Sequence, residues 1–311
     1  MIKSYFKNKA FFVFLNYLQY IFVRLSVGLI KLLPLEVVYK LGEKIGWICW
    51  KLLSSRRLTV RNNLIIVQRW LEHNGEGNTK SFDSICVDAA TKEVFCRTTA
   101  NLLSSFSFSN LPIEKRLPLV EFENLEVLKS AVKLDKGVVL LMAHMGPWEL
   151  ISCFPEHFAH HNVNARLGAI YRPLKNDYIE RWYRLQRKNQ GMDLFRRKAG
   201  LLEVFKFIKR GGILALLADQ RVSNGEQSEF FGKPALTSPL VGIISKKLSA
   251  SVISLTLKYD DACKLKATFR LVDFERCETR EEYAKTTNQE LEQVLSCDVN
   301  SGFWFHNRYK I

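Results

Sequence analysis

The stretch KGVVLLMAH, residues 136–144, decides the fold predicted for this chain. A continuous apolar run rich in Val and Leu follows a glycine and ends in a histidine. A short run of this kind, bounded by turn residues, is typical of a β-strand buried on both faces, as in a parallel sheet. We therefore predict a strand here, with His144 at its carboxyl end, where open α/β sheets bind their ligands.

Downstream of this strand, helical and extended patterns alternate along the chain. Strands are predicted at residues 164–171, 212–219, 251–259 and 265–274. Helices are predicted at residues 147–161, 175–190, 200–211, 238–248 and roughly 280–296. This alternation predicts an α/β fold, with a mixed, mostly parallel central sheet covered by helices.

Upstream, residues 34–64 have helical apolar spacing with basic residues on the other face, which predicts a helical annex. The polar, glycine-containing segment EHNGEGNTKSFDS, residues 72–84, is predicted to be a loop. The chain divides accordingly into a membrane-anchor helix at 1–33 and a catalytic α/β domain at 34–311.

The anchor is predicted from AFFVFLNYLQYIFV, residues 10–23, which carries no charge. No small-residue cleavage site follows, so a signal peptide fits poorly. A spanning helix needs about 20 apolar residues, and Asn16, Gln19 and Arg24 interrupt the run. A full span and an aromatic-rich helix in the membrane interface therefore both stay open, and a buried core helix is the third alternative. Basic residues lie mostly on the C-terminal side, which predicts that the main domain lies in the cytoplasm.

The charge of the chain indicates an acidic partner. The formal net charge is +15 over 311 residues, which suits nucleic acid, anionic lipid or an acidic carrier protein. The basic residues are dispersed, and no helix-turn-helix, RNP or KH signature is present, so we expect no nucleic acid. The seven cysteines are scattered without a C-x-x-C pair, which favours reduced thiols.

The strongest candidate for chemistry is the pair His144 and Glu149 in LMAHMGPWEL, residues 141–150. Gly146 allows a tight turn, and Pro147 suits the start of a helix. We expect the turn to fold back so that Glu149 accepts a hydrogen bond from one ring nitrogen, leaving the other as a general base. The alternative is structural: a histidine capping a strand end and a glutamate favouring a helix N-terminus.

Other polar residues follow the neighbouring strands and are expected at the same edge of the sheet. We predict that they form a substrate-binding set: Arg172, Arg196, Arg197, Asp219, Gln220 and Lys233. The basic residues of the helix at 175–190 suit an acidic carrier protein or anionic headgroups, or else form a solvated face.

Taken in order, these blocks resemble the bacterial lipid A biosynthesis lauroyl/myristoyl acyltransferase family, part of the wider lysophospholipid acyltransferase group. The motifs that carry the resemblance are RRLTVRNNL at 56–64, H-x4-E at 144–149, YRP at 171–173, DQ at 219–220, FFGKPALT at 230–237 and W-x-H-x-R at Trp304, His306 and Arg308.

The resemblance implies acyl transfer at the inner-membrane surface, from an acyl thioester on acyl carrier protein to a hydroxyl of a phosphorylated lipid A precursor. It implies that His144 is the general base, that Glu149 orients it, and that Arg172 contacts phosphate or an oxyanion. No cofactor or metal is expected. The form HMGPWE, residues 144–149, also resembles glycolipid acyltransferases acting on phosphatidylinositol mannosides, which leaves that acceptor and an acyl-CoA donor open.

Three further alternatives have weaker support in the sequence. A covalent acyl-enzyme would need a primed nucleophile, and Cys153 has only its proximity to Glu149 to recommend it. His157 and His161 have the spacing of a zinc pair, but no Cys or carboxylate pattern completes a site. An inactive membrane-tethered interaction protein is the alternative from a different class, and the intact His144 and Glu149 disfavour it.

Overall fold

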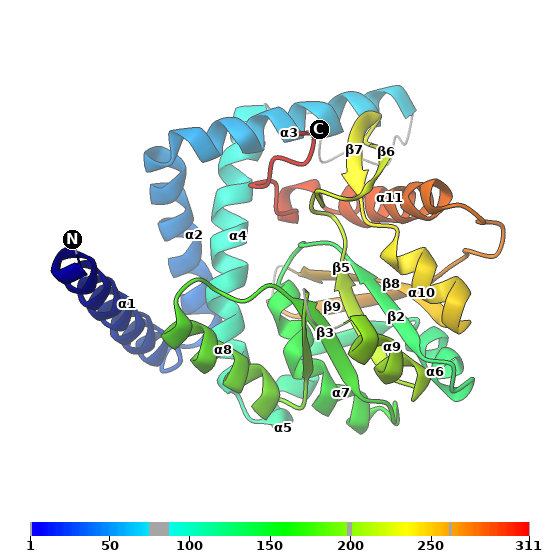
Figure 1. Ribbon diagram of the computed structural model, residues 1–311, viewed down its shortest axis with the longest axis horizontal. Helices are drawn as coiled ribbons and strands as arrows, with labels where there is room; N and C mark the ends of the chain where they lie inside the picture. Colours follow the sequence, from blue (N-terminus) through cyan, green and yellow to red (C-terminus); the bar gives the residue numbers. More distant parts are fainter. Residues whose placement is uncertain (1, 75–86, 198–200, 261–262, 311) are drawn as a thin grey trace.

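The computed structural model describes residues 2–74, 87–197, 201–260 and 263–310, with side chains from residue 11 onward. The loop predicted at 72–84 lies mostly outside these residues, and residues 72–74 complete helix α3. The fold is a central sheet with helices on both faces and a helical annex beside it (Figure 1).

Within the described residues the central sheet has seven strands. Their order across the sheet is β1 (Val120–Glu123), β9 (Leu265–Val272), β8 (Ser251–Tyr259), β2 (Val138–Met142), β5 (Ile213–Leu217), β3 (Leu167–Tyr171) and β4 (Asp193–Arg196). All neighbouring pairs are parallel except β8 and β9, which are antiparallel. The predicted mixed, mostly parallel α/β sheet is confirmed.

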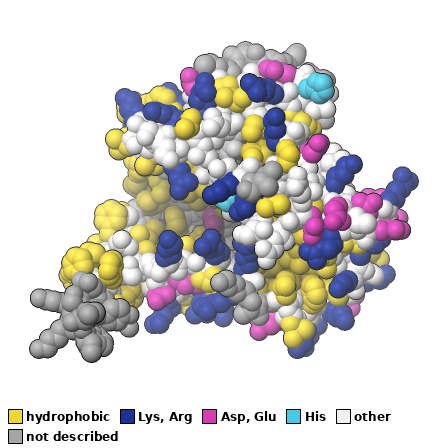
Figure 2. Space-filling model, turned by 45° about the horizontal axis from the view of Figure 1, so that its top comes forward, with side chains coloured by type: hydrophobic (Ala, Val, Ile, Leu, Met, Phe, Trp, Pro, Cys, Tyr) yellow, Lys and Arg dark blue, Asp and Glu magenta, His cyan; other side chains and the backbone are white. Residues whose placement is uncertain are grey.

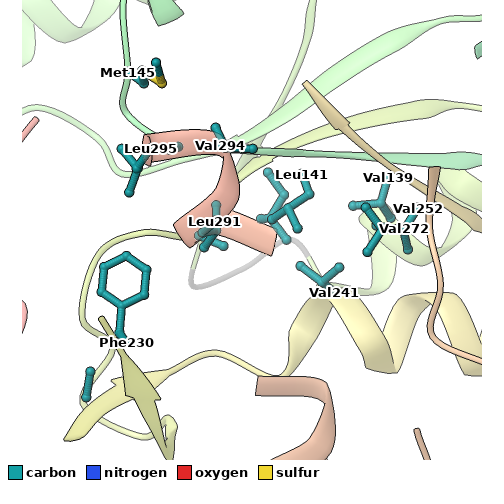
Figure 3. Close-up of a cluster of buried hydrophobic side chains, with 14 of the residues drawn as sticks. Val139, Leu141, Met145, Phe230, Val241, Val252, Val272, Leu291, Val294 and Leu295 are labelled. Carbon is teal, nitrogen blue, oxygen red and sulfur yellow. The ribbon is translucent and has the colours of Figure 1, made fainter. Parts of the chain in front are cut away.

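Strand β2 lies in the middle of the sheet and is buried on both faces, as its apolar run predicts. Val139 and Leu141 belong to the core on one face, beside α10 (Leu240–Leu248) and α11 (Arg280–Ser296) (Figure 3). The alternate residues of β2 belong to the core on the other face, with α6 (Leu125–Lys133) and α7 (Phe154–His160). Fully burying one such side chain contributes about 1.5–3 kcal/mol, so the sheet is held from both sides.

The annex is built from α2 (Leu35–Leu52), α3 (Ser54–Asn74) and α4 (Val87–Asn110). The predicted helical region at 34–64 is thus two helices, which meet at Leu53. α2 approaches α4 closely at two glycines, because a Cβ on Gly42 would lie 2.4 Å from Ala100 Cα and one on Gly46 2.4 Å from Phe95 O. Because Gly42 and Gly46 are four residues apart, they lie on the same side of α2 and let its backbone approach that of α4.

The remaining helices connect the annex and the strands. They are α5 (Ile113–Arg116), α8 (Asp177–Asn189), α9 (Leu201–Lys209) and the 3-10 helices η1 (Leu117–Leu119), η2 (Trp148–Cys153) and η3 (Val299–Ser301). Helix α1 (Ile2–Ile30) projects from the annex and reaches α8 (Figure 1). Among the described residues, only its segment Phe11–Ile30 is long and apolar enough to cross a membrane, by length and composition.

One predicted helix differs in the structure, and one hairpin was not predicted. The helix predicted at 147–161 is the 3-10 helix η2 followed by α7, because Pro155 has no N–H to continue a helix and instead occupies the first turn of α7. The FFGKPALT block, residues 230–237, lies in a hairpin of β6 (Glu226–Phe230) and β7 (Lys233–Thr237), for which no strand was predicted. Its two turn residues, Phe231 and Gly232, both have positive φ, as a tight hairpin turn requires.

Candidate active site

A cavity of about 400 Å³ lies at the carboxyl ends of β2, β3 and β5, with η2 and α8 forming its wall. Five residues predicted for the site line it: His144, Glu149, Arg172, Arg197 and Gln220. The clustering at one edge follows from the parallel strands, whose carboxyl ends face the same way. Figure 2 shows a face of the molecule with a hollow in its middle and Lys and Arg side chains around that hollow.

The other three residues predicted for the site are described by the structure but do not line this cavity. Arg196 ends β4 and is exposed, and Lys233 is exposed at the tip of the β6–β7 hairpin. Asp219 is only 9% exposed and lies behind His144. Its predicted place among the substrate-binding residues stays a prediction, because the contact that the structure shows for the carboxylate is with the protein itself.

The partner of the Asp219 carboxylate is His144. The Nδ1 atom of His144 lies 2.7 Å from Oδ1 of Asp219. The parallel register explains the contact, because Met142 on β2 is paired with Leu217 on β5, and both polar residues follow two positions later. Among the described residues the other ring nitrogen, Nε2, has no hydrogen bond to protein, so it is the one left for substrate.

The electrostatics of this pair make the His144 ring a stronger base. Burial lowers the pKa of His144, but the charge and hydrogen bond of Asp219 raise it, and the net direction is above the ordinary value. Burial likewise raises the pKa of Asp219, while His144 lowers it, and the net direction is downward. Each group thus stabilises the charged form of the other, and Asp219 is the group that fixes the ring.

The expectation that Glu149 accepts from His144 is wrong in this structure. The Glu149 carboxylate instead accepts hydrogen bonds of 2.6 Å from the Tyr183 hydroxyl and from Arg187, both on α8. The turn at Gly146, with φ of +56°, leads into η2 and directs Glu149 towards α8. An added Cβ at Gly146 would lie 2.0 Å from Leu257 O, so only glycine fits this turn.

The back of the site is closed by residues far away in the sequence. The backbone N–H of Phe303 donates to His144 O at 2.7 Å, and that of Gly146 donates to Ser301 O at 3.0 Å. On α3, the amide of Asn63 donates to Trp304 O at 2.8 Å and to His306 O at 3.0 Å. The motifs at 56–64 and 304–308 are therefore joined behind the catalytic candidates.

Arg308 makes a second such connection. It is 3% exposed and donates to Leu236 O at 2.5 Å, to Thr237 Oγ1 at 2.6 Å and to Asn288 Oδ1 at 3.1 Å. It thereby ties the FFGKPALT hairpin to α11 and to the segment that supports His144. These blocks support the site from behind.

The cavity carries more cations than free anions. Four arginines line it: Arg172, Arg187, Arg197 and Arg221. Of the two lining carboxylates, Glu149 is taken by α8, and Glu180 accepts from the Tyr171 hydroxyl at 2.9 Å and from the Leu174 N–H at 3.0 Å. Sequence reasoning missed Arg221, although it directly follows the DQ block. This excess of positive charge suits a phosphorylated substrate.

Two alternative chemistries lose support. Cys153 is 1% exposed, and burial raises the pKa of its thiol to about 11, so a reactive thiolate is disfavoured. His157 is fully buried, and its burial lowers the pKa to about 4. No group of three or more His, Cys, Asp or Glu side chains in the described part of the chain is arranged to hold a metal ion.

The comparisons with known proteins agree with this geometry. A family model for bacterial lipid A biosynthesis acyltransferases matches residues 7–311. The chain belongs to this family. A lipid A biosynthesis acyltransferase is an enzyme that transfers acyl groups, and the matched residues include the sheet, the annex and the whole described cavity. A comparison with curated proteins gives no match.

Proposed function

We propose that this enzyme transfers a fatty acyl chain from acyl carrier protein to a hydroxyl of a lipid A precursor, at the cytoplasmic face of the inner membrane. One observation carries the proposal: a histidine held by a buried carboxylate at a cavity with an excess of arginines. A base is needed because a neutral hydroxyl attacks a thioester poorly, and cations are needed because the acceptor carries phosphate.

In the proposed reaction Nε2 of His144 accepts the proton of the acceptor hydroxyl as its oxygen attacks the thioester carbonyl. The tetrahedral intermediate collapses, the carbon–sulfur bond breaks, and the leaving thiolate takes the proton from His144. The products are an ester and the free thiol of the carrier. Asp219 keeps Nδ1 protonated and stabilises the imidazolium that forms when Nε2 takes the proton, so the working form of His144 is the neutral ring.

The arginines divide between two tasks in this proposal. Arg172 and Arg197 are exposed, line the cavity and bind the acceptor phosphate. Arg221 is half-buried beside the Asp219–Gln220 strand end and is our candidate for stabilising the oxyanion. Glu149 acts through α8, since it fixes Tyr183 and Arg187 in the cavity wall.

The test is a transfer assay with purified full-length protein in mixed micelles, with mass spectrometry of the lipid product. We expect acylation of a phosphorylated lipid A precursor by acyl carrier protein thioester, and about a 10²- to 10⁴-fold loss in His144→Ala. Parallel assays use acyl-CoA as donor and phosphatidylinositol mannoside as acceptor. Product only from that second pair would overturn the proposed substrates while leaving the reaction class.

The direct mechanism predicts no covalent intermediate. Intact-protein mass spectra recorded with donor alone should therefore show only the unmodified chain. A stoichiometric acyl adduct on Cys153 or on a serine would replace the general-base mechanism with a two-step covalent one.

The role of Arg172 is tested by Arg172→Lys, which keeps the charge but loses the planar pair of donors. We expect KM for the phosphorylated acceptor to rise about tenfold or more, with KM for the donor little changed. Equal KM values in the variant and the wild type would remove Arg172 from the acceptor site.

A further inference from the structure

Helix α1 has two faces that differ in exposure. One face is buried or half-buried against the protein and consists of Asn16, Tyr20, Val23, Val27 and Ile30. The other face, the outer stripe, consists of Phe11, Phe14, Leu18, Phe22, Leu25 and Leu29, with exposed fractions of 47–72%. Both sets recur every three or four residues, which is the spacing of one side of an α-helix.

Helix α1 docks on α8 through polar and aromatic contacts made by its inner face and by residues at the border of that face. The Asn176 amide donates to Asn16 O at 2.8 Å and to Gln19 Oε1 at 3.2 Å. The Tyr178 ring lies 5.4 Å from that of Tyr17, measured between ring centroids. The polar residues that interrupt the apolar run therefore serve this contact.

Arg24 extends the contact between α1 and α8 further along α1. Its guanidinium lies 5.5 Å from the centroid of the Trp182 ring, on α8. Helix α8 also carries the exposed charged residues Arg181 and Lys188. Because α8 runs beside residues 16–24 of α1, a span over Phe11–Ile30 would carry the charges of α8 into the hydrocarbon, where they are strongly disfavoured.

A span placed further towards the N-terminus meets the same obstacle. It would place Lys3, Lys7 and Lys9 within the hydrocarbon instead. With α1 docked on α8, no stretch of about 20 residues in α1 is free to cross the bilayer.

We propose that α1 is a monotopic anchor, whose outer stripe enters the bilayer leaflet next to the catalytic domain and does not cross. The inference rests on the proposed membrane association and adds its topology. Helices α1 and α2 together form one side of the molecule, outside α4 (Figure 1), and hydrophobic side chains gather on this side in Figure 2.

Helix α2 extends the anchoring surface. Its exposed apolar residues are Val37, Leu41, Ile45, Ile48 and Leu52, again three or four apart. Lys40, Lys44 and Lys51 are exposed among them and complement anionic headgroups. An apolar stripe with flanking lysines fits the bilayer surface, where the stripe meets acyl chains and the lysines meet phosphates.

The first test is sidedness. Ser4→Cys places a thiol before the apolar stretch, and the native, exposed Cys297 reports the side of the catalytic domain. In right-side-out vesicles we expect a membrane-impermeant maleimide to label neither site until the membrane is opened. Labelling of Ser4→Cys alone from outside would overturn the proposal. Labelling of both thiols from outside would place them on the same side and so support a monotopic α1, but it would reject the cytoplasmic location of the catalytic domain.

The second test asks whether α1 stays docked in the membrane. The double variant Tyr17→Cys/Tyr178→Cys should form a disulfide under mild oxidation in anionic phosphatidylglycerol vesicles. The matched control, Leu18→Cys/Tyr178→Cys, places its first thiol on the outer stripe and should cross-link at least tenfold more slowly. Equal rates in the two variants would show that the docked α1 does not exist in the membrane. Acyl transfer is assayed separately, so loss of the proposed function is distinguishable from loss of this topology.

Discussion

At the residue scale, the chemistry depends on which carboxylate holds His144. The sequence suggested Glu149, five positions away, because a turn can bring near neighbours together. The structure pairs His144 with Asp219, which is 75 positions away and reaches it through the β2–β5 register. Asp219 was visible in the sequence as a strand-end carboxylate, but its partner depends on strand order, which no local pattern encodes.

Asp219→Asn tests this assignment through pH. Loss of the Asp219 charge removes the larger of the two carboxylate effects that raise the pKa of His144. That pKa should therefore fall, because burial lowers it and only the smaller effect of the Glu149 charge opposes burial. The acidic limb of the kcat profile should therefore move to lower pH, while maximal kcat falls about 10²- to 10⁴-fold. An unmoved limb would mean that Asp219 does not control the titration of His144.

Glu149→Gln should behave differently. It leaves the His144–Asp219 pair in place and weakens the hold on Tyr183 and Arg187, so the acidic limb should move less than in Asp219→Asn. Arg187→Lys weakens the bond to Glu149 from the other side. We therefore expect Arg187→Lys and Glu149→Gln to lower kcat by about the same factor. If Glu149→Gln shifts the limb as far as Asp219→Asn does, Glu149 acts on the histidine directly.

At the element scale, the sequence predicted the long strands and helices well. β2 and β5 have continuous apolar runs, β8 has apolar residues alternating with polar ones over most of its length, and the positions of all three are confirmed. β1 and β4 were missed because four residues such as VEFE or DLFR are too short to show a period. α4 was also missed, and its buried face is rich in Ser and Thr, so its helical stripe is not marked by apolar residues.

Asn176 is the element-scale residue to test, because its side chain has two tasks. Its Oδ1 caps α8 by accepting from the N–H groups of Tyr178 and Ile179, and its Nδ2 donates to α1. Asn176→Asp keeps an acceptor cap and loses the donor, whereas Asn176→Ala loses both.

Thermal unfolding should separate the two variants. Asn176→Ala should lower stability by about 0.5–2 kcal/mol through loss of the cap, and Asn176→Asp should lose less. Both should impair the Tyr17–Tyr178 cross-link described above. Equal stability of the two variants would show that the cap contributes little to α8.

At the scale of the whole molecule, the proposed membrane association rests on two kinds of force: burial of the outer stripe and attraction of the +15 net charge to anionic lipid. They respond differently to salt, because at about 1 M the screening length is only about 3 Å, whereas apolar burial persists. The sequence indicated both forces, but it could not show which face of α1 the protein itself covers.

Deletion of residues 1–33 should separate these forces. In low salt the truncated protein should still sediment partly with membranes, and in 1 M salt it should be released while the full-length protein stays bound. Equal partition of the two proteins in high salt would reject α1 as the anchor. The deletion also removes the partners of α8, so a fall in kcat in detergent is expected as well.

The closure of the site by residues 301–308 has a consequence for the protein during its synthesis. The proposed anchor helix α1 leaves the ribosome before any residue of the site. The residues that support His144 from behind, Ser301, Phe303 and the tail bound by Asn63, are synthesised last and leave the ribosome last. A nascent chain can therefore reach the bilayer long before its base is held in place. On the proposed membrane location, the enzyme would arrive at its lipid surface before its site is complete, and the site would be assembled there.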